Sequence, residues 1–220
     1  MSDRQLVVTG GWAAVIAGLV GAGAAAFLLL VPHMVAPDRF SFPLTATGFV
    51  VIQTLFFLHH LLVAWALWAF WRGGLAGRGT LAAIGGIASV VALLALSVQE
   101  LVAITAAESG YPSPLTDVIE STYGVITLAA GAVLIVFGIA AARARVLSGP
   151  GRWLILVIGI WVIVPLTPAI FAGFELGRIA IGLWFLLFTW MGAEMIRWAR
   201  STPSEDAAPA APAAERVGRA

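Results

Sequence analysis

The sequence contains no cysteine and no lysine, and charged residues make up only 10% of its 220 positions. Soluble domains carry about 25% charged residues, so this composition excludes an ordinary soluble globular protein. The absence of cysteine excludes disulfides, thiolate zinc sites, cysteine-bound iron–sulfur clusters and attached c-type haem. Twelve arginines and eleven acidic residues leave a net charge of +1, which offers no basic surface for nucleic acid.

Hydrophobic residues make up 61% of the chain, and the few charges divide it into six long apolar runs. A helix that crosses a hydrocarbon core of about 30 Å needs about 20 such residues, and unpaired backbone groups are too costly there for any open structure. The expected spans are residues 6–31, 47–71, 80–107, 121–142, 153–173 and 177–199. The sequence therefore predicts an all-α, polytopic integral membrane protein, with a bundle over 1–199 and a disordered, Ala/Pro-rich cytoplasmic tail over 200–220.

Arginine is distributed unevenly among the loops. Ten of the twelve arginines lie at the amino end, in the two even-numbered turns or at the carboxyl end, and only Arg39 and Arg178 lie in the other loops. Cytoplasmic loops carry the excess of basic residues, so both termini are expected to be cytoplasmic. Cations that are all arginine, together with abundant alanine and glycine, indicate a GC-rich bacterial genome and hence a bacterial plasma membrane.

Small residues recur at helical spacing and predict where helices meet, because helices in lipid associate by close backbone approach. The first span carries a row at every fourth position: Gly10, Ala14, Gly18, Ala22 and Ala26. The fourth span carries Gly124, Gly131 and Gly138 at a seven-residue spacing. Both rows are interpreted as packing faces.

The fifth span contains Pro165 and Pro168 on either side of Thr167. Each proline removes a backbone donor and leaves a carbonyl free one turn earlier. We expect this helix to be kinked or partly unwound in its outer half, with neighbouring protein or water satisfying the freed groups.

Polar residues inside the spans are costly and therefore mark candidate functional positions. At 1.5 Å per residue, four of them lie about 9 to 10 Å below the external boundary, and others lie at about 15 to 20 Å. The outer group is Gln53, Glu100, Thr127 and Thr167, and the deeper group is His59, His60 and Ser97. Together they predict an outward-opening polar pocket that narrows toward the two histidines.

Glu100 is the central residue of this hypothesis. A carboxyl group at this depth should be either protonated or paired with a cation or hydrogen-bond donor. No arginine is expected at its level, so its candidate partners are His59, His60 or water. The other acids have local explanations. Asp117 and Glu120 are expected to cap the fourth helix, Glu175 to pair with Arg178, and Glu194 with Arg197.

Three classes of function remain open. The first is a small transporter or ligand-binding protein for an ion or small molecule, because proton-coupled transport needs titratable groups near the midplane. The second is a structural or assembly subunit that packs against copies of itself or a membrane partner within the bilayer. The third is an intramembrane enzyme or redox protein, with Ser97, His60 and Glu100 as the residue types of a triad.

No cofactor or metal site is indicated by the residues. Adjacent His59 and His60 cannot bind one haem iron from both faces within a single chain. No nucleotide loop, zinc-protease helix or calcium loop occurs in the sequence.

Overall fold

The computed structural model describes residues 3–201, which form six helical segments long and apolar enough to cross a membrane. Five are single helices: α1 (Asp3–Leu30), α2 (Ala46–Arg72), α3 (Thr80–Ile104), α4 (Pro114–Ala144) and α7 (Phe174–Ser201). The fifth in order consists of η1 (Gly149–Trp153), α5 (Leu154–Trp161), η2 (Val162–Leu166) and α6 (Thr167–Ala172). The prediction of an all-helical chain with six such segments is confirmed. The predicted tail, apart from the end of α7, lies outside the described residues.

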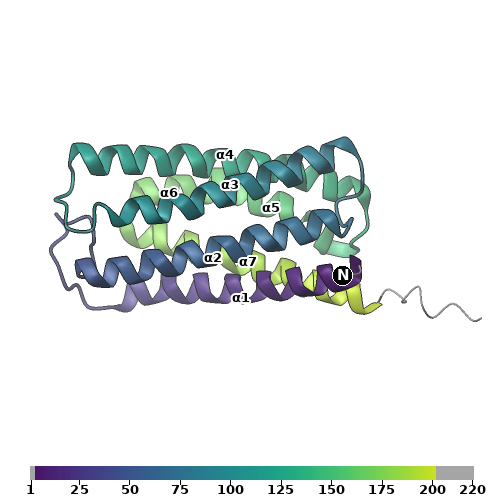
Figure 1. Ribbon diagram of the computed structural model, residues 1–220, viewed down its shortest axis with the longest axis horizontal. Coiled ribbons are helices and arrows are strands. Elements are labelled where there is room, and N and C mark those ends of the chain that lie inside the picture. The colour runs from purple at the N-terminus through teal and green to yellow at the C-terminus, as the bar shows by residue number, and fades with distance from the viewer. Residues whose placement is uncertain (1–2, 202–220) are drawn as a thin grey trace, which may run out of the picture.

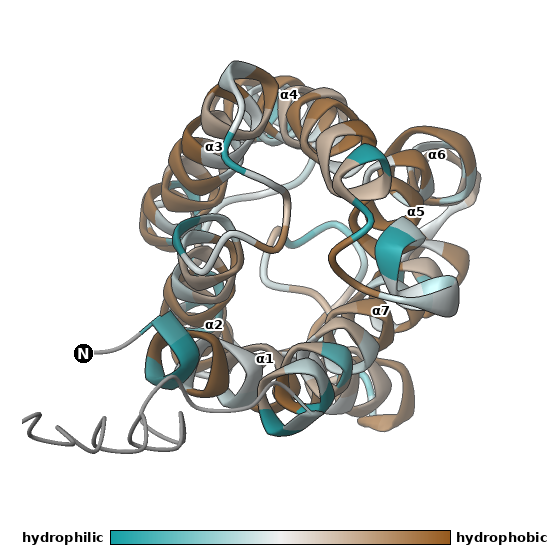
Figure 2. Cartoon of the chain, turned by 90° about the vertical axis from the view of Figure 1, so that its right-hand side faces the viewer, coloured by the Kyte–Doolittle hydropathy of each residue, from teal (hydrophilic) through white to brown (hydrophobic). Residues whose placement is uncertain are grey.

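The segments stand side by side, and successive ones run in opposite directions (Figure 1). Figure 2, viewed along the bundle, shows them arranged in chain order around a ring. Each packs on its neighbours in sequence, and α1 closes the ring by packing on α7. One end of the bundle holds the start of α1, the turns 73–79 and 145–148 and the end of α7, and is called the terminal end. The opposite end holds residues 31–45, 105–113 and Gly173, and is called the loop end.

Glycine allows α1 to contact both of its neighbours closely. A Cβ added at Gly11 would lie 2.7 Å from Ile196 of α7, and one at Gly10 would overlap Ala69 of α2. Gly10, Ala14 and Gly18 of the predicted row are buried, whereas Ala22 is half-buried and Ala26 is exposed. The row leaves the interface because an α-helix has 3.6 residues per turn, so a strict four-residue row drifts around it. Gly21, Ala25 and Leu28 continue the contact.

The largest error in the predicted spans concerns α4, which begins at Pro114 rather than at residue 121. Ser113 is the N-cap, and it exchanges hydrogen bonds with Thr116 in a capping box, with proline at the first helical position. The predicted cap by Asp117 and Glu120 is therefore wrong. Glu120 instead accepts a hydrogen bond from the Tyr111 hydroxyl (3.1 Å), whose pKa is raised by burial and by this carboxylate.

The other boundaries differ by a few residues. The third helix ends at Ile104 rather than 107, and α7 extends from Phe174 to Ser201 rather than over 177–199. The expected Arg197–Glu194 ion pair is present, and Trp190 Nε1 also donates to Glu194 (3.0 Å).

The two prolines of the fifth segment produce a wide helical turn rather than an unwound stretch. Pro165 lies inside the π-helix η2, and Pro168 lies in the first turn of α6. The Thr167 backbone N–H donates to the Val162 carbonyl, and the Thr167 hydroxyl donates to the same oxygen (2.7 Å). Local hydrogen bonds thus satisfy the Val162 carbonyl, and the segment stays helical through both prolines.

Two loops meet over the loop end, and together residues 31–45 and 105–113 are called the loop cap. Arg39 and Gly110 form an antiparallel bridge, and the Tyr111 N–H donates to the Asp38 carbonyl (2.7 Å). Phe40 packs edge-on against Phe49 of α2, with ring centroids 5.5 Å apart. The loop cap is thus joined both internally and to the helices below it.

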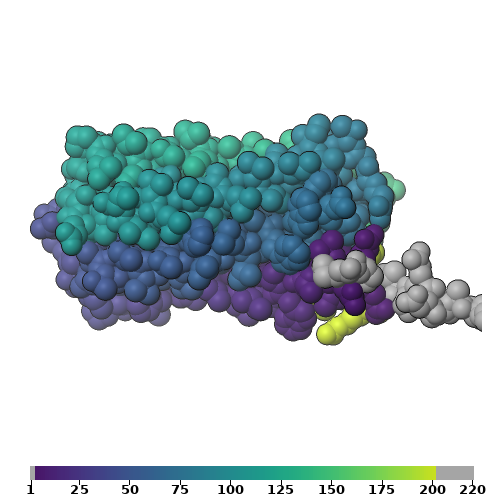
Figure 3. Space-filling view, in the orientation of Figure 1, coloured from purple at the N-terminus to yellow at the C-terminus, as the bar shows by residue number. Residues whose placement is uncertain are grey.

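Apolar side chains cover the outside of the bundle. Between 33% and 50% of the residues in the most apolar window of each segment are buried, so at least half contact the surroundings. The exposed set includes Trp12, Leu19, Val51, Val91 and Val125. In the space-filling view α1, α2, α3 and α4 follow one another without a wide opening (Figure 3).

Close helix contact at Gly85 gives a test of this packing. A Cβ at Gly85 of α3 would lie 2.7 Å from the Phe137 Cα of α4, which is backbone and cannot rotate away. We expect Gly85→Ala to destabilise the protein by about 1–3 kcal/mol through overpacking. The measurement is thermal unfolding in detergent, followed by circular dichroism.

Gly124→Ala is the matched control, because a Cβ at Gly124 of α4 meets nothing within 4 Å. It should leave Tm unchanged or raise it slightly, since alanine is the better helix former. Equal Tm values for Gly85→Ala and the wild type would contradict the described α3–α4 contact.

Candidate functional site

Glu100 is the centre of a buried polar cluster below the loop cap. Its carboxylate, on α3, is only 6% exposed. Oε2 accepts a hydrogen bond from the Tyr123 hydroxyl of α4 (2.7 Å), and Oε1 lies 3.5 Å from His60 Nδ1 of α2. Gln53 Nε2, also on α2, donates to the Tyr123 hydroxyl (3.1 Å). Three consecutive helices thus contribute to one connected group, called the Glu100 cluster.

Helical periodicity explains why these side chains meet. Gln53 and His60 are seven residues apart and lie on one face of α2, which also buries Phe56 and Val63. Glu100 shares the inward face of α3 with Leu93, Leu96 and Ser97. Since α2 and α3 are antiparallel neighbours, the loop-end halves of both inward faces lie at the same level.

Tyr123 is a member of the cluster that the sequence interpretation missed. The fourth helix was expected to start at residue 121, and Thr127 was taken as its polar contribution, while Tyr123 was not considered. Because α4 starts at Pro114, Tyr123 is already in its third turn. A buried tyrosine hydroxyl almost always has a hydrogen-bond partner. A tyrosine expected at a membrane depth close to that of Glu100 could therefore have been recognised as a candidate partner of this carboxylate.

Arg178 supplies a cation that the sequence interpretation did not expect near Glu100. Its guanidinium interacts electrostatically with Glu100 and Tyr123 and lies over the Phe174 ring at 5.2 Å. Within residues 3–201 it forms no ion pair shorter than 4.0 Å, so the expected pair with Glu175 is absent. The long side chain extends from the first turns of α7 into the bundle, which Cα depth alone does not reveal.

His59 lies deeper and is enclosed almost completely, with 1% of its surface exposed. Its ring packs edge-on against Phe185 of α7 (4.3 Å between centroids) and against His60 (4.9 Å). A Cβ at Gly21 of α1 would lie 2.8 Å from Nε2, so glycine at that position makes room for the imidazole. The ring faces the Ala17 backbone, but neither nitrogen makes a hydrogen bond of normal geometry.

The remaining candidates are not hydrogen-bonded to the Glu100 cluster. Ser97 donates to the Phe57 carbonyl (3.3 Å), so its hydroxyl joins α3 to α2 and is not directed at His60 as a triad would require. Thr167 donates to the Val162 carbonyl, as described above. Thr127 is half-buried and lies one turn beyond Tyr123 on the same face of α4.

The described residues contain no group of three His, Cys, Asp or Glu side chains placed to hold a metal ion. Glu100 and His60, with His59 packed against His60, form a titratable group. Its chemistry is that of hydrogen bonding and proton exchange.

No protein-family model, no curated protein and no solved structure matches this chain. The geometry of the Glu100 cluster is therefore the basis for assigning a function.

The Tyr123 hydroxyl joins two otherwise separate polar groups, which makes Tyr123→Phe an informative change. The variant keeps the ring but removes the two hydrogen bonds that the Tyr123 hydroxyl makes, to Glu100 Oε2 and from Gln53 Nε2. Each unsatisfied buried group costs about 1–3 kcal/mol, so thermal unfolding should show a clearly lower Tm. Tyr111→Phe is the control, because that hydroxyl bonds to Glu120 at an exposed position. Equal Tm values for the two variants would argue against the buried network.

The role assigned to Thr167 is to stabilise the backbone of the fifth segment through its hydroxyl. Thr167→Val tests this role, because it removes the side-chain hydrogen bond to the Val162 carbonyl and keeps the shape of the side chain. A loss of about 0.5–1.5 kcal/mol is expected, because the backbone N–H of residue 167 still bonds to that oxygen. Thr127→Val, at a position with no hydrogen bond among those described, should change the unfolding temperature less. A larger loss of stability for Thr127→Val than for Thr167→Val would contradict the structural role of Thr167.

Proposed function

We propose that this chain is an integral membrane protein whose six segments cross the bilayer of a bacterial plasma membrane. The apolar outer surface supports insertion, since lipid would cover side chains that water does not favour. The terminal end would face the cytoplasm because it carries most of the arginines, including Arg72, Arg78, Arg143 and Arg197. The loop cap would then lie on the outer side.

Within this arrangement we propose a small transporter that binds a proton together with a small ion or molecule at the Glu100 cluster. The observation that carries the proposal is the connected chain from Gln53 through Tyr123 and Glu100 to His60. It is buried, it contains groups that can exchange a proton, and it extends from the loop end toward the middle of the bundle. Such groups inside a membrane protein typically mark ion or proton pathways.

Proton movement in the cluster follows from the positions of its atoms. A proton on the Glu100 carboxyl can pass from Oε1 to His60 Nδ1 after the 3.5 Å separation shortens to hydrogen-bond length. This leaves a carboxylate beside Arg178 and an imidazolium on α2, so the net charge of the cluster is unchanged. The Tyr123 hydroxyl donates to the carboxylate and stabilises it.

Access from outside would require the loop cap to move, because the Glu100 cluster is buried beneath it. The cap is held partly by contacts between its own two loops, such as the Phe40 N–H to the Ser109 carbonyl (3.1 Å). It could therefore move as one unit without separating the helices. Arg178, nearest the loop end, would meet an entering ligand early and favour negative charge.

Ligand-induced stabilisation of the purified protein tests this function. A panel of inorganic ions, short amines and short monocarboxylates would be added at acidic and at neutral pH. At about a hundred times its Kd, a ligand stabilises the folded state by about 2.7 kcal/mol, which is several degrees in Tm. A ligand that binds with a proton should stabilise more strongly at acidic pH, because the two binding events favour each other.

Glu100→Gln should remove this stabilisation, whereas Glu194→Gln, a buried acid at the terminal end, should keep it. If no compound stabilises the wild type, or if Glu100→Gln responds equally, the transporter proposal fails. A Glu100→Gln variant with lower basal stability and no ligand response to lose would favour the structural or assembly role. The close glycine contacts of α1 are the observation behind that second candidate.

A further inference from the structure

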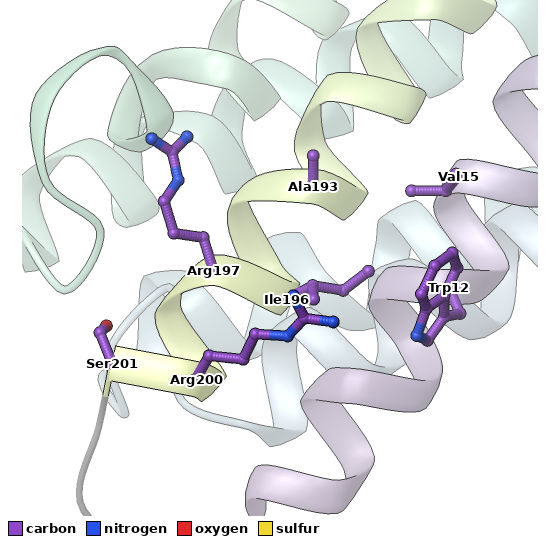
Figure 4. A pocket seen from close by; sticks show the side chains of 7 residues that line it. All are labelled: Trp12, Val15, Ala193, Ile196, Arg197, Arg200 and Ser201. Atoms are coloured by element: carbon purple, nitrogen blue, oxygen red, sulfur yellow. The ribbon is translucent and has the colours of Figure 1, made fainter.

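A groove at the terminal end is separate from the Glu100 cluster. It lies between α1 and α7 and has a volume of about 640 Å³. Figure 4 shows the side chains that line it, including Trp12 and Val15 from α1 and Ala193, Ile196 and Arg200 from α7. The groove is open to the surroundings, and half of the Trp12 surface is exposed.

The groove combines an apolar floor with a cationic rim. Val15, Ala193 and Ile196 provide hydrocarbon surface, and arginines lie at the outer margin. Arg197 is paired with Glu194, whereas Arg200 forms no ion pair with any side chain in residues 3–201. Figure 4 shows Arg200 extending toward Trp12, while Arg197 points to the other side of α7. Arg200 is therefore the cation available to a ligand in the groove.

We propose that this groove binds one anionic phospholipid, with its phosphate on Arg200 and an acyl chain along Val15, Ala193 and Ile196. A guanidinium matches the geometry of phosphate oxygens and can bind them in a bidentate manner. An indole such as Trp12 is typical of the boundary between headgroups and acyl chains. A free phosphate would leave the apolar floor uncovered, and the ammonium group of a zwitterionic lipid would oppose the attraction between its phosphate and Arg200.

The direction of α7 makes Arg200 decisive for this selectivity. The groove lies near the carboxyl end of α7, where the helix dipole contributes partial negative charge. Without its arginines, that helix end would repel an anionic headgroup. Selectivity for anionic lipid should consequently depend on Arg200 more than on the general charge of the surface.

Native mass spectrometry of the detergent-purified protein can measure this binding. Phosphatidylglycerol and phosphatidylcholine with identical acyl chains would be titrated separately onto the wild type, Arg200→Gln and Trp12→Ala. We expect the wild type to bind phosphatidylglycerol more tightly than phosphatidylcholine. Arg200→Gln should lower the affinity for phosphatidylglycerol by about fivefold and leave the affinity for phosphatidylcholine unchanged. Trp12→Ala should lower the affinity for both lipids, because it removes apolar contact.

Arg78→Gln is the matched control, since Arg78 lies at the same end but is paired with Asp3 (3.0 Å) and lies outside the groove. It should keep the lipid preference of the wild type. Equal binding of both lipids by the wild type, or an equal effect of Arg78→Gln and Arg200→Gln, would overturn the proposal.

A second test asks whether the acidic residues that follow α7 in the sequence, Glu205 and Asp206, compete with lipid for the groove. If replacing Glu205 with Gln and Asp206 with Asn tightens phosphatidylglycerol binding, those residues occupy the groove in place of lipid, and the proposal fails. Unchanged binding by this variant supports the lipid assignment. None of these outcomes depends on whether the protein transports a ligand.

Discussion

Close contact between α1 and two neighbours determines the architecture of the bundle. Gly10 allows α1 to approach α2, and Gly11 and Gly18 allow it to approach α7. In the bilayer proposed above, helices would gain little from hydrophobic association, so short distances between backbones would carry much of the packing energy. Because the first and last segments meet in this way, the six segments form a ring with an inward face on each helix.

That inward face determines where polar side chains can be placed. Glu100, Tyr123 and His60 come from three helices, and a carboxylate there needs partners supplied by the neighbouring segments. The Gly21 position of α1 provides space for the His59 ring, which lies beside His60. Close packing and the buried polar cluster are therefore connected, since the glycines that close the ring also accommodate an imidazole.

The sequence was a good guide to features that depend on local hydropathy and spacing. The six segments, the Glu194–Arg197 pair and the irregular helix at Pro165 and Pro168 follow from such patterns. Counting residues from the helix ends placed Gln53 and Glu100 at one depth, and His60, although counted into the deeper group, was one of the candidate partners of Glu100. These inferences need no knowledge of side-chain direction.

The sequence was a poor guide to features that depend on how far a side chain extends from its backbone or on which of two possible N-caps begins a helix. Tyr123 was not considered, and Arg178, whose long side chain extends well beyond the level of its own backbone, was assigned to an external loop. Ser113 and Thr116 form a better cap than Asp117 and Glu120, which moved the start of α4 by two turns. Thr167 was assigned to the polar layer, whereas its hydroxyl donates to the backbone carbonyl of Val162.

The wide turn at Val162–Leu166 also divides the fifth wall of the ring into two packing units. Before it, α5 lies against α4 through the backbone contact of Gly159 with Ile135. After it, α6 packs on α7 and has no fully buried residue of its own. One continuous segment therefore follows a different neighbour in each half. A change in the separation of α4 and α7 at the loop end can be absorbed by bending at this turn, with both interfaces left intact.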